Sequence, residues 1–466
     1  MSRINTNVSS LIAQRVLRKN NDSLSTSLER LSTGLKINSG KDNPAGLIAS
    51  ENLKAEQAGI TQAIDNAGRA SNIIGTAEGG LGEVSNLLTE LQSLVSQSAN
   101  TGGLSTEEVQ ANQLQVDSIL NTINRIAQST AFQGKKLLNG NYAYTTSGVT
   151  STQFDNVQIN AARIPDGATV DVVVQVTASA QTGEVQYGNG ALTDGVTLEI
   201  AGNTGTEQLS FASGTAITDI AKAINAVTTA TGVSAAVSGT TLRVDSTGYG
   251  SDSFVSVKTV AGTFVPTATK DNGQDAAVTI NGASAQTNGL NVSYRSSNID
   301  VEFDLDSTFN TPGTGTFTIT GGGANFALGS KVSETDKASI GIQSVSTGSL
   351  GDTNNGFLSE LASGGSASLD SNNLVTAQKI IDKAIKQVSQ LRGRLGAFQK
   401  FTIGSTINSL GVAYENVSAS NSAIRDTDFA EETANLTRSQ ILAQSATTVL
   451  AQANASPQAA LSLLRG

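Results

Sequence analysis

The sequence predicts an α+β protein in which both chain ends build one long antiparallel, coiled-coil-like helical rod around an inserted β-rich outer domain. Apolar residues repeat every seven positions near both ends, a pattern typical of packed helices. The middle is rich in Thr, Val, Gly and Ser, a composition typical of strands and turns. Proline, which breaks helices, is absent from 45–164 and 313–456, where the helical patterns are strongest.

The composition narrows the classes of function. The 466 residues carry a net charge of −10 and include no Cys and no His. These absences exclude imidazole bases, thiolate nucleophiles, disulfides and the usual zinc sites, so we expect neither an enzyme nor a cofactor. An enzyme would have to use an Asp/Glu pair of the β-rich part, for example for glycoside cleavage. The acidic charge argues against nucleic acid as a partner, and no run approaches the roughly 18 apolar residues of a membrane span.

The N-terminal part predicts three helices. In the first helix one apolar row is Leu17, Leu24 and Leu31, and the other is Leu28 and Leu35. Asn43 and Pro44 are typical of the N-cap and first residue of the second helix. Its apolar row, stepping by three and four, is Leu81, Val84, Leu88, Leu91 and Val95. Ser105 and Glu108 form a capping box that begins the third helix. The apolar row of that helix is Val116, Ile119, Ile123 and Ile126.

The C-terminal part predicts helices of the same kind. One row is Leu374, Ile381, Val388 and Leu395, and the second is Ala377, Ala384, Leu391 and Phe398. After Phe398 the register shifts by one residue, and Ile403, Leu410, Val417 and Ile424 resume the repeat. The last row is Phe429, Leu436, Ala443 and Leu450. Such rows need partner helices, from the other end of this chain or from other chains, because one helix cannot bury its own apolar side.

The middle predicts strands and one short helix. The expected strands are 170–176, 196–200, 241–245, 254–257, 277–280, 299–305 and 316–319, and the expected helix is 215–228. Four acids, Asp300, Glu302, Asp304 and Asp306, alternate with apolar residues and should share one strand face. We interpret that face as solvated. A calcium site is the alternative, but the turn glycine and carbonyl ligands of a calcium loop are missing.

Motifs occur in order near both chain ends. The first set is 4–7 and 32–46, and the second is 424–432, 440–442 and 449–454. In these motifs the chain resembles the bacterial flagellins, the subunits of flagellar filaments, over roughly residues 1–140 and 335–466. Residues 196–258 resemble a repeat inserted in some flagellins and filament-cap proteins.

The resemblance implies three structural parts. Residues 1–42 and 425–466 would be the terminal helices of an inner tube. Residues 43–145 and 335–424 would be a helical rod domain with a β-hairpin. Residues 146–334 would be a variable, β-rich outer domain.

The resemblance also implies a function. The chain would polymerise into the flagellar filament for swimming, after export in an unfolded state by the flagellar type III apparatus and assembly at the distal tip. Its location would be extracellular, in the filament. Its partners would be copies of itself, the cap protein, the hook–filament junction protein and an export chaperone. A junction protein or a minor filament component is the alternative.

Residue roles follow from the same resemblance. The expected filament-core assembly residues are Ile4, Val8, Leu11, Leu17, Leu24, Leu28, Leu31, Leu35, Phe429, Leu436, Ile441, Leu450, Leu461 and Leu464. The expected rod-core residues are Leu88, Leu91, Leu94, Val116, Ile123, Leu374, Ile381, Val388 and Leu395.

A surface read by the vertebrate flagellin receptor is a further expectation from the family. Leu88 and Leu94 fit its motif, although both residues also fit a rod core. The other positions differ from the family residues: Thr89 replaces a Gln, Glu90 replaces an Arg, Gln115 replaces a Glu, and Lys400 replaces an Arg. The charge reversal at Glu90 predicts weak or absent recognition.

Overall fold

The computed structural model describes residues 6–100, 102–165, 167–371 and 373–465, with side chains up to 456. The chain divides into two compact units. Unit 1 is Met1–Gly68, Leu328–Asp336 and Gly404–Gly466, and unit 2 is Arg69–Ala327 and Lys337–Ile403. The helices are α1 Val8–Thr33, α2 Pro44–Ser98, α3 Thr106–Ser129, α4 Ile217–Ala226, α5 Thr228–Thr231, α6 Leu374–Ala397, α7 Gly404–Arg425 and α8 Phe429–Arg465. Helical ends and a β-rich middle confirm the predicted α+β class.

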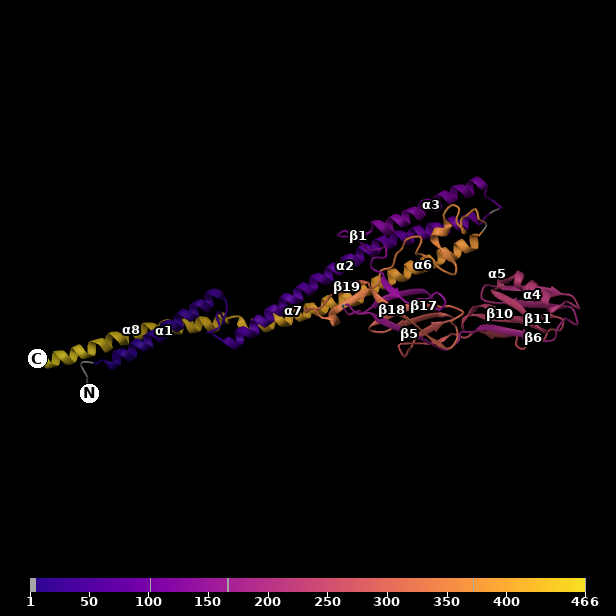
Figure 1. The fold of residues 1–466 in the computed structure, drawn as a ribbon. Helices are drawn as coiled ribbons and strands as arrows, with labels where there is room; N and C mark the ends of the chain where they lie inside the picture. The colour runs from indigo at the N-terminus through magenta and orange to yellow at the C-terminus, as the bar shows by residue number, and fades with distance from the viewer. Residues whose placement is uncertain (1–5, 101, 166, 372, 466) are drawn as a thin grey trace. The chain divides into compact units, whose positions relative to one another are not determined.

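In unit 1, α1 and α8 lie side by side and antiparallel (Figure 1). Asn7 Nδ2 donates to the Ala453 carbonyl at 2.8 Å, and Arg30 pairs with Glu432 at 3.4 Å at the other end. Helix α1 ends at Gly34, whose φ of 72° is left-handed and suits glycine. Leu35 therefore leaves the helical row in which we expected it and forms a β-bridge with Asp426.

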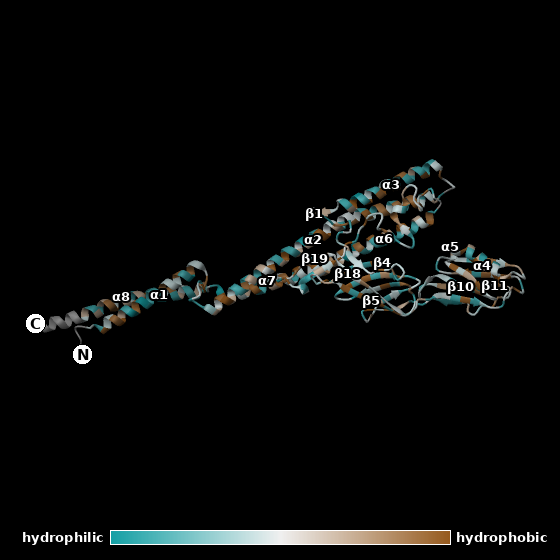
Figure 2. Cartoon of the chain, in the orientation of Figure 1, coloured by the Kyte–Doolittle hydropathy of each residue, from teal (hydrophilic) through white to brown (hydrophobic). Residues whose placement is uncertain are grey.

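In unit 2, α6 runs antiparallel to the second half of α2. Arg392 pairs with Glu78 at 2.8 Å, and Gln92 Nε2 donates to Asp382 at 3.2 Å. Helix α3 begins with the predicted capping box, because the Glu108 amide donates to Ser105 Oγ and the Ser105 amide to Glu108 Oε2. Figure 2 shows apolar residues recurring between polar ones along α2 and α6.

The register shift after Phe398 has a structural cause. Residues Phe398–Ile403 form a π-helix, η3, directly after α6. A π-turn holds one more residue than an α-turn. This extra residue accounts for the one-residue shift between the row that ends at Leu395 and the row that resumes at Ile403.

Short strands connect the helices of unit 2 to the middle of the chain. The hairpin β1 (Ala131–Phe132) and β2 (Lys135–Lys136) turns at Gln133 and Gly134, with φ of 50° and 80°. Near the return lie β19 Ala324–Ala327, β20 Lys337–Ile340, β21 Gly351–Asp352 and β22 Gly356–Phe357, with the 3₁₀ helices η1 Glu334–Asp336 and η2 Leu358–Leu361.

The middle contains a β-sandwich with its own core. One sheet has the order β14-β13-β5-β18-β3 and the other β15-β16-β17-β4. The strands are β3 Tyr144–Ser147, β4 Phe154–Ala162, β5 Val170–Ala178, β13 Ala277–Ile280, β14 Ala283–Ser284, β15 Gln286–Asn288, β16 Asn291–Arg295, β17 Ile299–Leu305 and β18 Gly313–Gly322. Phe154, Phe303 and Phe317 meet edge-to-face between the sheets, with ring centres 5.3–6.1 Å apart.

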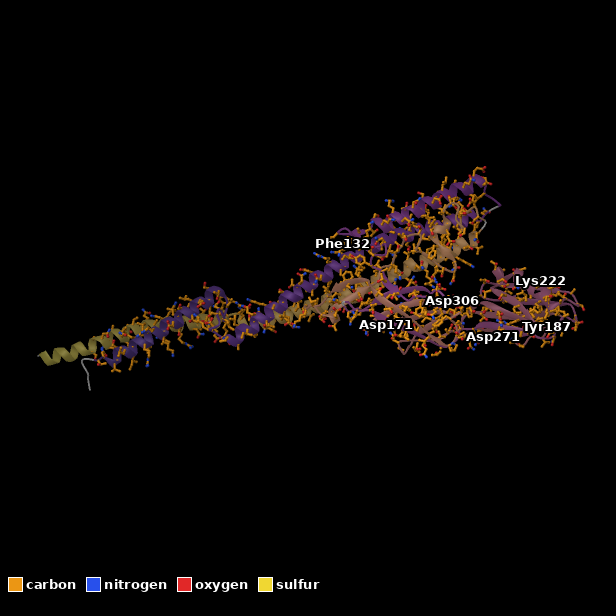
Figure 3. All side chains as sticks on the ribbon, in the orientation of Figure 1. Phe132, Asp171, Tyr187, Lys222, Asp271 and Asp306 are labelled. Carbon is orange, nitrogen blue, oxygen red and sulfur yellow. The ribbon has the colours of Figure 1, made fainter. Side chains whose placement is uncertain are left out.

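A second module, with a separate core, is inserted between β5 and β13. Its sheets have the orders β6-β10-β9 and β12-β11-β7-β8, and α4 buries Ile217, Ile220, Ala221 and Ile224. The strands are β6 Thr182–Tyr187, β7 Val196–Ala201, β8 Thr206–Phe211, β9 Val233–Ser238, β10 Thr241–Tyr249, β11 Phe254–Ala261 and β12 Lys270–Asn272. Tyr187, labelled in Figure 3, stacks on Phe264 at 4.0 Å.

All seven predicted strands lie within observed strands, and the predicted short helix corresponds to α4. Strands such as β4 and β6 were not predicted, because polar residues interrupt their apolar alternation.

The expectation that the four acids share one solvated strand face holds only in part. Asp300, Glu302 and Asp304 are half-buried, and asparagine amides donate to both aspartates, from Asn160 at 2.9 Å and Asn291 at 2.8 Å. Asp306 does not share their strand, because β17 ends at Leu305.

Candidate assembly surfaces

Small and polar residues line the contact between α1 and α8. The α1 row that loses exposure steps by three and four residues: Ser10, Ala13, Leu17, Asn20, Leu24, Ser27 and Leu31. The matching residues of α8 are Glu432, Leu436, Ala443, Ala446 and Leu450. Few large side chains are fully buried there, so this pair gains little free energy from apolar burial compared with a leucine-rich seam.

The other faces of the same two helices leave large apolar side chains in solvent. They are Val8, Leu11, Ile12, Val16 and Leu28 of α1, and Phe429, Ile441, Leu442 and Val449 of α8. Leu28, expected in the second packed row, is 51% exposed. Ser27 occupies that row instead, in register with Ala13 and Asn20. Contiguous exposed apolar surface of this kind marks an interaction site.

The remaining expected assembly residues are half-buried or lie outside the part of the chain that is described. Leu17, Leu24, Leu31, Leu35, Leu436 and Leu450 are half-buried. Ile4 lies outside the described residues. Leu461 and Leu464 belong to α8, but their side chains are outside the described part of the chain.

The segment between α1 and α2 is held by backbone hydrogen bonds to the segment between α7 and α8. The Lys36 amide donates to the Arg425 carbonyl at 2.7 Å, and the Thr427 amide donates to the Gly34 carbonyl at 3.0 Å. Asn43 Oδ1 caps α2 by accepting from the Gly46 amide at 2.9 Å, as the sequence predicted. This tie brings the two sequence motifs 32–46 and 424–432 together.

Two carboxylates, Asp42 and Glu51, are held by hydrogen bonds or ion pairs near these connecting segments. Hydrogen bonds from the Ser39 amide and hydroxyl lower the pKa of Asp42 below its usual value. Glu51 pairs with Arg425 at 2.7 Å, and this contact, assisted by Lys54, lowers the pKa of Glu51.

The expected rod-core residues lie mainly inside unit 2. Leu88, Leu91, Leu94, Val116, Ile123, Ile381, Val388 and Leu395 are buried, and Leu374 is half-buried. This burial corrects the receptor-surface expectation for Leu88 and Leu94, because neither side chain is available at the surface. Thr89, Glu90, Gln115 and Lys400 are exposed.

Buried polar side chains also fasten the rod, and the sequence analysis missed them. Gln113, 5% exposed, donates through Nε2 to the Leu361 carbonyl at 2.9 Å and accepts from the Leu369 amide at 2.8 Å. Asp117 accepts from the Ser363 amide at 2.9 Å. Burial alone would raise the pKa of Asp117, but the hydrogen bonds from Ser363 and Gln113 lower it below its usual value. A polar residue three positions before Val116, inside an apolar row, was the available signal.

In the part of the chain that the structure describes, the Asp and Glu side chains form no group of three or more suited to a metal ion. None of the described helices has the length and hydropathy needed to cross a bilayer.

Three regions match known family models. Residues 4–143 match the bacterial flagellin N-terminal helical region, 378–464 the C-terminal helical region and 197–248 the flagellin hook IN motif. Flagellin B of Vibrio cholerae serotype O1 is 31% identical over 99% of both chains. The polar flagellin B/D of Vibrio parahaemolyticus serotype O3:K6 is 32% identical, also over 99% of both chains. The solved structure of FliC from Burkholderia pseudomallei is 18% identical and covers 71% of this chain and 99% of its own, with a TM-score of 0.25.

Proposed function

The chain belongs to the bacterial flagellin family, and from that premise we propose that it polymerises with copies of itself into the flagellar filament. Val8, Leu11, Ile441 and Val449 on the outer faces of α1 and α8 carry the proposal, because these apolar side chains stay exposed when the two helices have paired. Neighbouring subunits would cover them and supply the burial that the small-residue contact between α1 and α8 does not.

The three expected parts then have distinct roles in the proposal. Residues 1–42 and 425–466 form the inner tube, residues 43–145 and 335–424 form the rod layer, and residues 146–334 project outward. The subunit is exported unfolded through the flagellar type III apparatus, aided by an export chaperone. It is added beneath the cap at the distal tip, beyond the hook–filament junction protein. The filament is extracellular and drives swimming.

A charged substitution in the exposed apolar face tests polymerisation. Val449→Asp should abolish seeded polymerisation, because a carboxylate would be buried against the next subunit without a partner. The matched control is Val260→Asp, which changes a comparably exposed valine in the inserted module. Sedimentation of seeded filaments and circular dichroism of the monomers measure assembly and folding. Filaments of normal yield and length from folded Val449→Asp would contradict the proposal.

A junction protein or minor filament component remains the second candidate, since it would use similar terminal helices. The mass fraction of this chain in purified filaments separates the two. A major subunit should make up most of the filament mass, whereas a junction protein should be confined to one end.

We propose that this chain binds the vertebrate flagellin receptor weakly. Glu90, exposed on α2, would repel the acidic partner that the family's arginine attracts. Glu90→Arg should therefore strengthen binding to the vertebrate flagellin receptor, and Glu83→Arg, another exposed glutamate of the helix, should not.

A further inference from the structure

The β-sandwich faces helix α6 with polar side chains on both surfaces. In β17, Ile299, Val301, Phe303 and Leu305 are buried in the sandwich core, so Asp300, Glu302 and Asp304 lie on the opposite face of the sheet. In α6 the apolar row from Ala377 to Leu395 is buried in the rod, and the other side of the helix carries Lys383, Lys386, Gln390 and Arg394. Most apolar side chains of each element thus serve its own core, although Val157 and Ile159 of β4 also line one space with Val388 and Leu391 of α6.

Cavities separate the two polar surfaces. One of about 310 Å³ is lined by Glu302 and Asp304 from the sheet and by Lys383, Lys386 and Gln390 from α6. A second of about 280 Å³ is lined by Asn160, Arg295 and Glu302 from the sheet and by Gln390 and Arg394 from α6. Spaces of this size with several polar partners admit water, so this contact gains little from close packing.

Arg394 has polar atoms that need a partner. Its Nε and Nη1 are buried and have no hydrogen-bond partner in the described structure, and neither has Asn160 Oδ1 across the cavity. Burial lowers the pKa of Arg394, while the nearby carboxylates of Asp300 and Glu302 oppose that effect. A guanidinium in this position favours docking only while carboxylates face it.

The chain also provides a place to bend. It passes from the rod into the sandwich near Gly140, with φ of 93°, and returns near Ile342. The two passing segments pair with each other, the Ile342 amide donating to the Tyr142 carbonyl at 2.9 Å. Rotation there would separate α6 from the sheet and leave both cores intact.

We propose that the β-sandwich is held on α6 by a hydrated electrostatic clasp, formed by Lys386 and Arg394 facing Glu302 and Asp304, which salt opens reversibly. The sandwich is then a detachable domain that swings about the segments near 140 and 342. Lys383 is already paired with Asp352 at 3.3 Å, and Arg295 with Asp300 at 3.3 Å. Two cations, Lys386 and Arg394, and two carboxylates, Glu302 and Asp304, are then left to balance each other in the cavity linings. Raising the ionic strength from about 0.1 M to 1 M shortens the screening length from about 10 Å to 3 Å, which weakens such pairs more than apolar cores.

Spin labels on the full-length monomer test the clasp. The chain has no cysteine, so Ser118→Cys on α3 and Ser284→Cys on β14, both exposed in the structure, give one labelled pair. Distances between the labels report docking, and circular dichroism reports folding. The wild-type distribution should be narrow at low salt and broad at about 1 M NaCl. Arg394→Met should increase the undocked population at low salt roughly tenfold, the range between an exposed and a buried ion pair.

Two further variants make the test specific. Exchanging the charges by combining Arg394→Glu with Glu302→Arg should restore the narrow distribution at low salt. Lys222→Met, on α4 of the inserted module (Figure 3), should leave it unchanged. If Arg394→Met fails to fold, Glu302→Gln replaces it with the same expected broadening. Folded Arg394→Met or Glu302→Gln with a distribution as narrow as that of the wild type at low salt would overturn the proposal. So would a wild-type distribution that does not respond to salt.

Discussion

Gln113 should be a major contributor to the stability of the rod, although it is an uncharged polar residue in an apolar row. Its side chain bonds to Leu361 and Leu369, which are 248 and 256 residues further along the chain. The change Gln113→Leu removes these two hydrogen bonds and a third, to Asp117, and leaves a buried backbone carbonyl and a buried backbone amide without partners. Each unsatisfied group costs about 1–3 kcal/mol, so the two cost roughly 2–6 kcal/mol together. Burying the leucine returns about 1–2 kcal/mol, leaving a net loss of about 0–5 kcal/mol, centred near about 2.5 kcal/mol.

The matched control is Gln115→Leu, which makes the same chemical change two residues away on the exposed side of α3. It should alter stability by less than about 0.5 kcal/mol. Denaturant unfolding of the monomer gives the free-energy difference, and amide hydrogen exchange of peptides covering 358–371 shows where protection is lost. Equal stabilities for the two variants, or unchanged exchange in 358–371 of Gln113→Leu, would refute the reasoning.

Three other changes follow from particular contacts. Hydrogen bonds lower the pKa of Asp117 in the folded chain, so the ionised carboxylate stabilises the fold above about pH 4. This stabilisation is lost as the pH falls through the lower folded-state pKa, and Asp117→Asn should therefore flatten the acid-induced loss of stability. An identical pH profile for the variant and the wild type would contradict this. Deleting Lys400 should let the π-helix become α-helical with little change in melting temperature. Deleting Ser389 instead turns the buried rows of α6 by about 100° and should lower the melting temperature. Equal melting temperatures for the two deletions would disprove the explanation of the register shift. Asn310→Ala leaves the buried amide and carbonyl of Ala180 unpaired and should cost roughly 2–4 kcal/mol in chemical unfolding; a loss below about 0.5 kcal/mol would show that these groups find other partners.

The helices and many strands could be predicted because their signals are local. The capping box at Ser105, the N-cap at Asn43 and the row from Ala377 to Leu395 each depend on residues close in sequence. The one-residue register shift after Phe398 was also visible in the sequence. Its cause, a π-helix, required backbone geometry.

The assembly surface could be predicted only in part. The sequence identified apolar positions in α1 and α8, but a helix turn of 3.6 residues makes neighbours such as Ser27 and Leu28 equally plausible for the packed face. Only the pairing of the helices shows that Ser27 is buried and Leu28 is exposed. The same ambiguity left Leu88 and Leu94 between a rod core and a receptor surface until their burial was known.

Composition and local patterns were enough for the α+β class, the family and the lack of His and Cys chemistry, and they favoured pairing of the two chain ends. Only the folded structure shows which face of each helix stays open. It also shows that the outer region has two cores, and that half-buried acids of β17 line cavities together with cations of α6. The physical reason is the distance along the chain. Periodicity and caps act over a few residues, whereas contacts such as Gln113 with Leu369 or Glu302 near Arg394 exist only after the chain has folded back on itself.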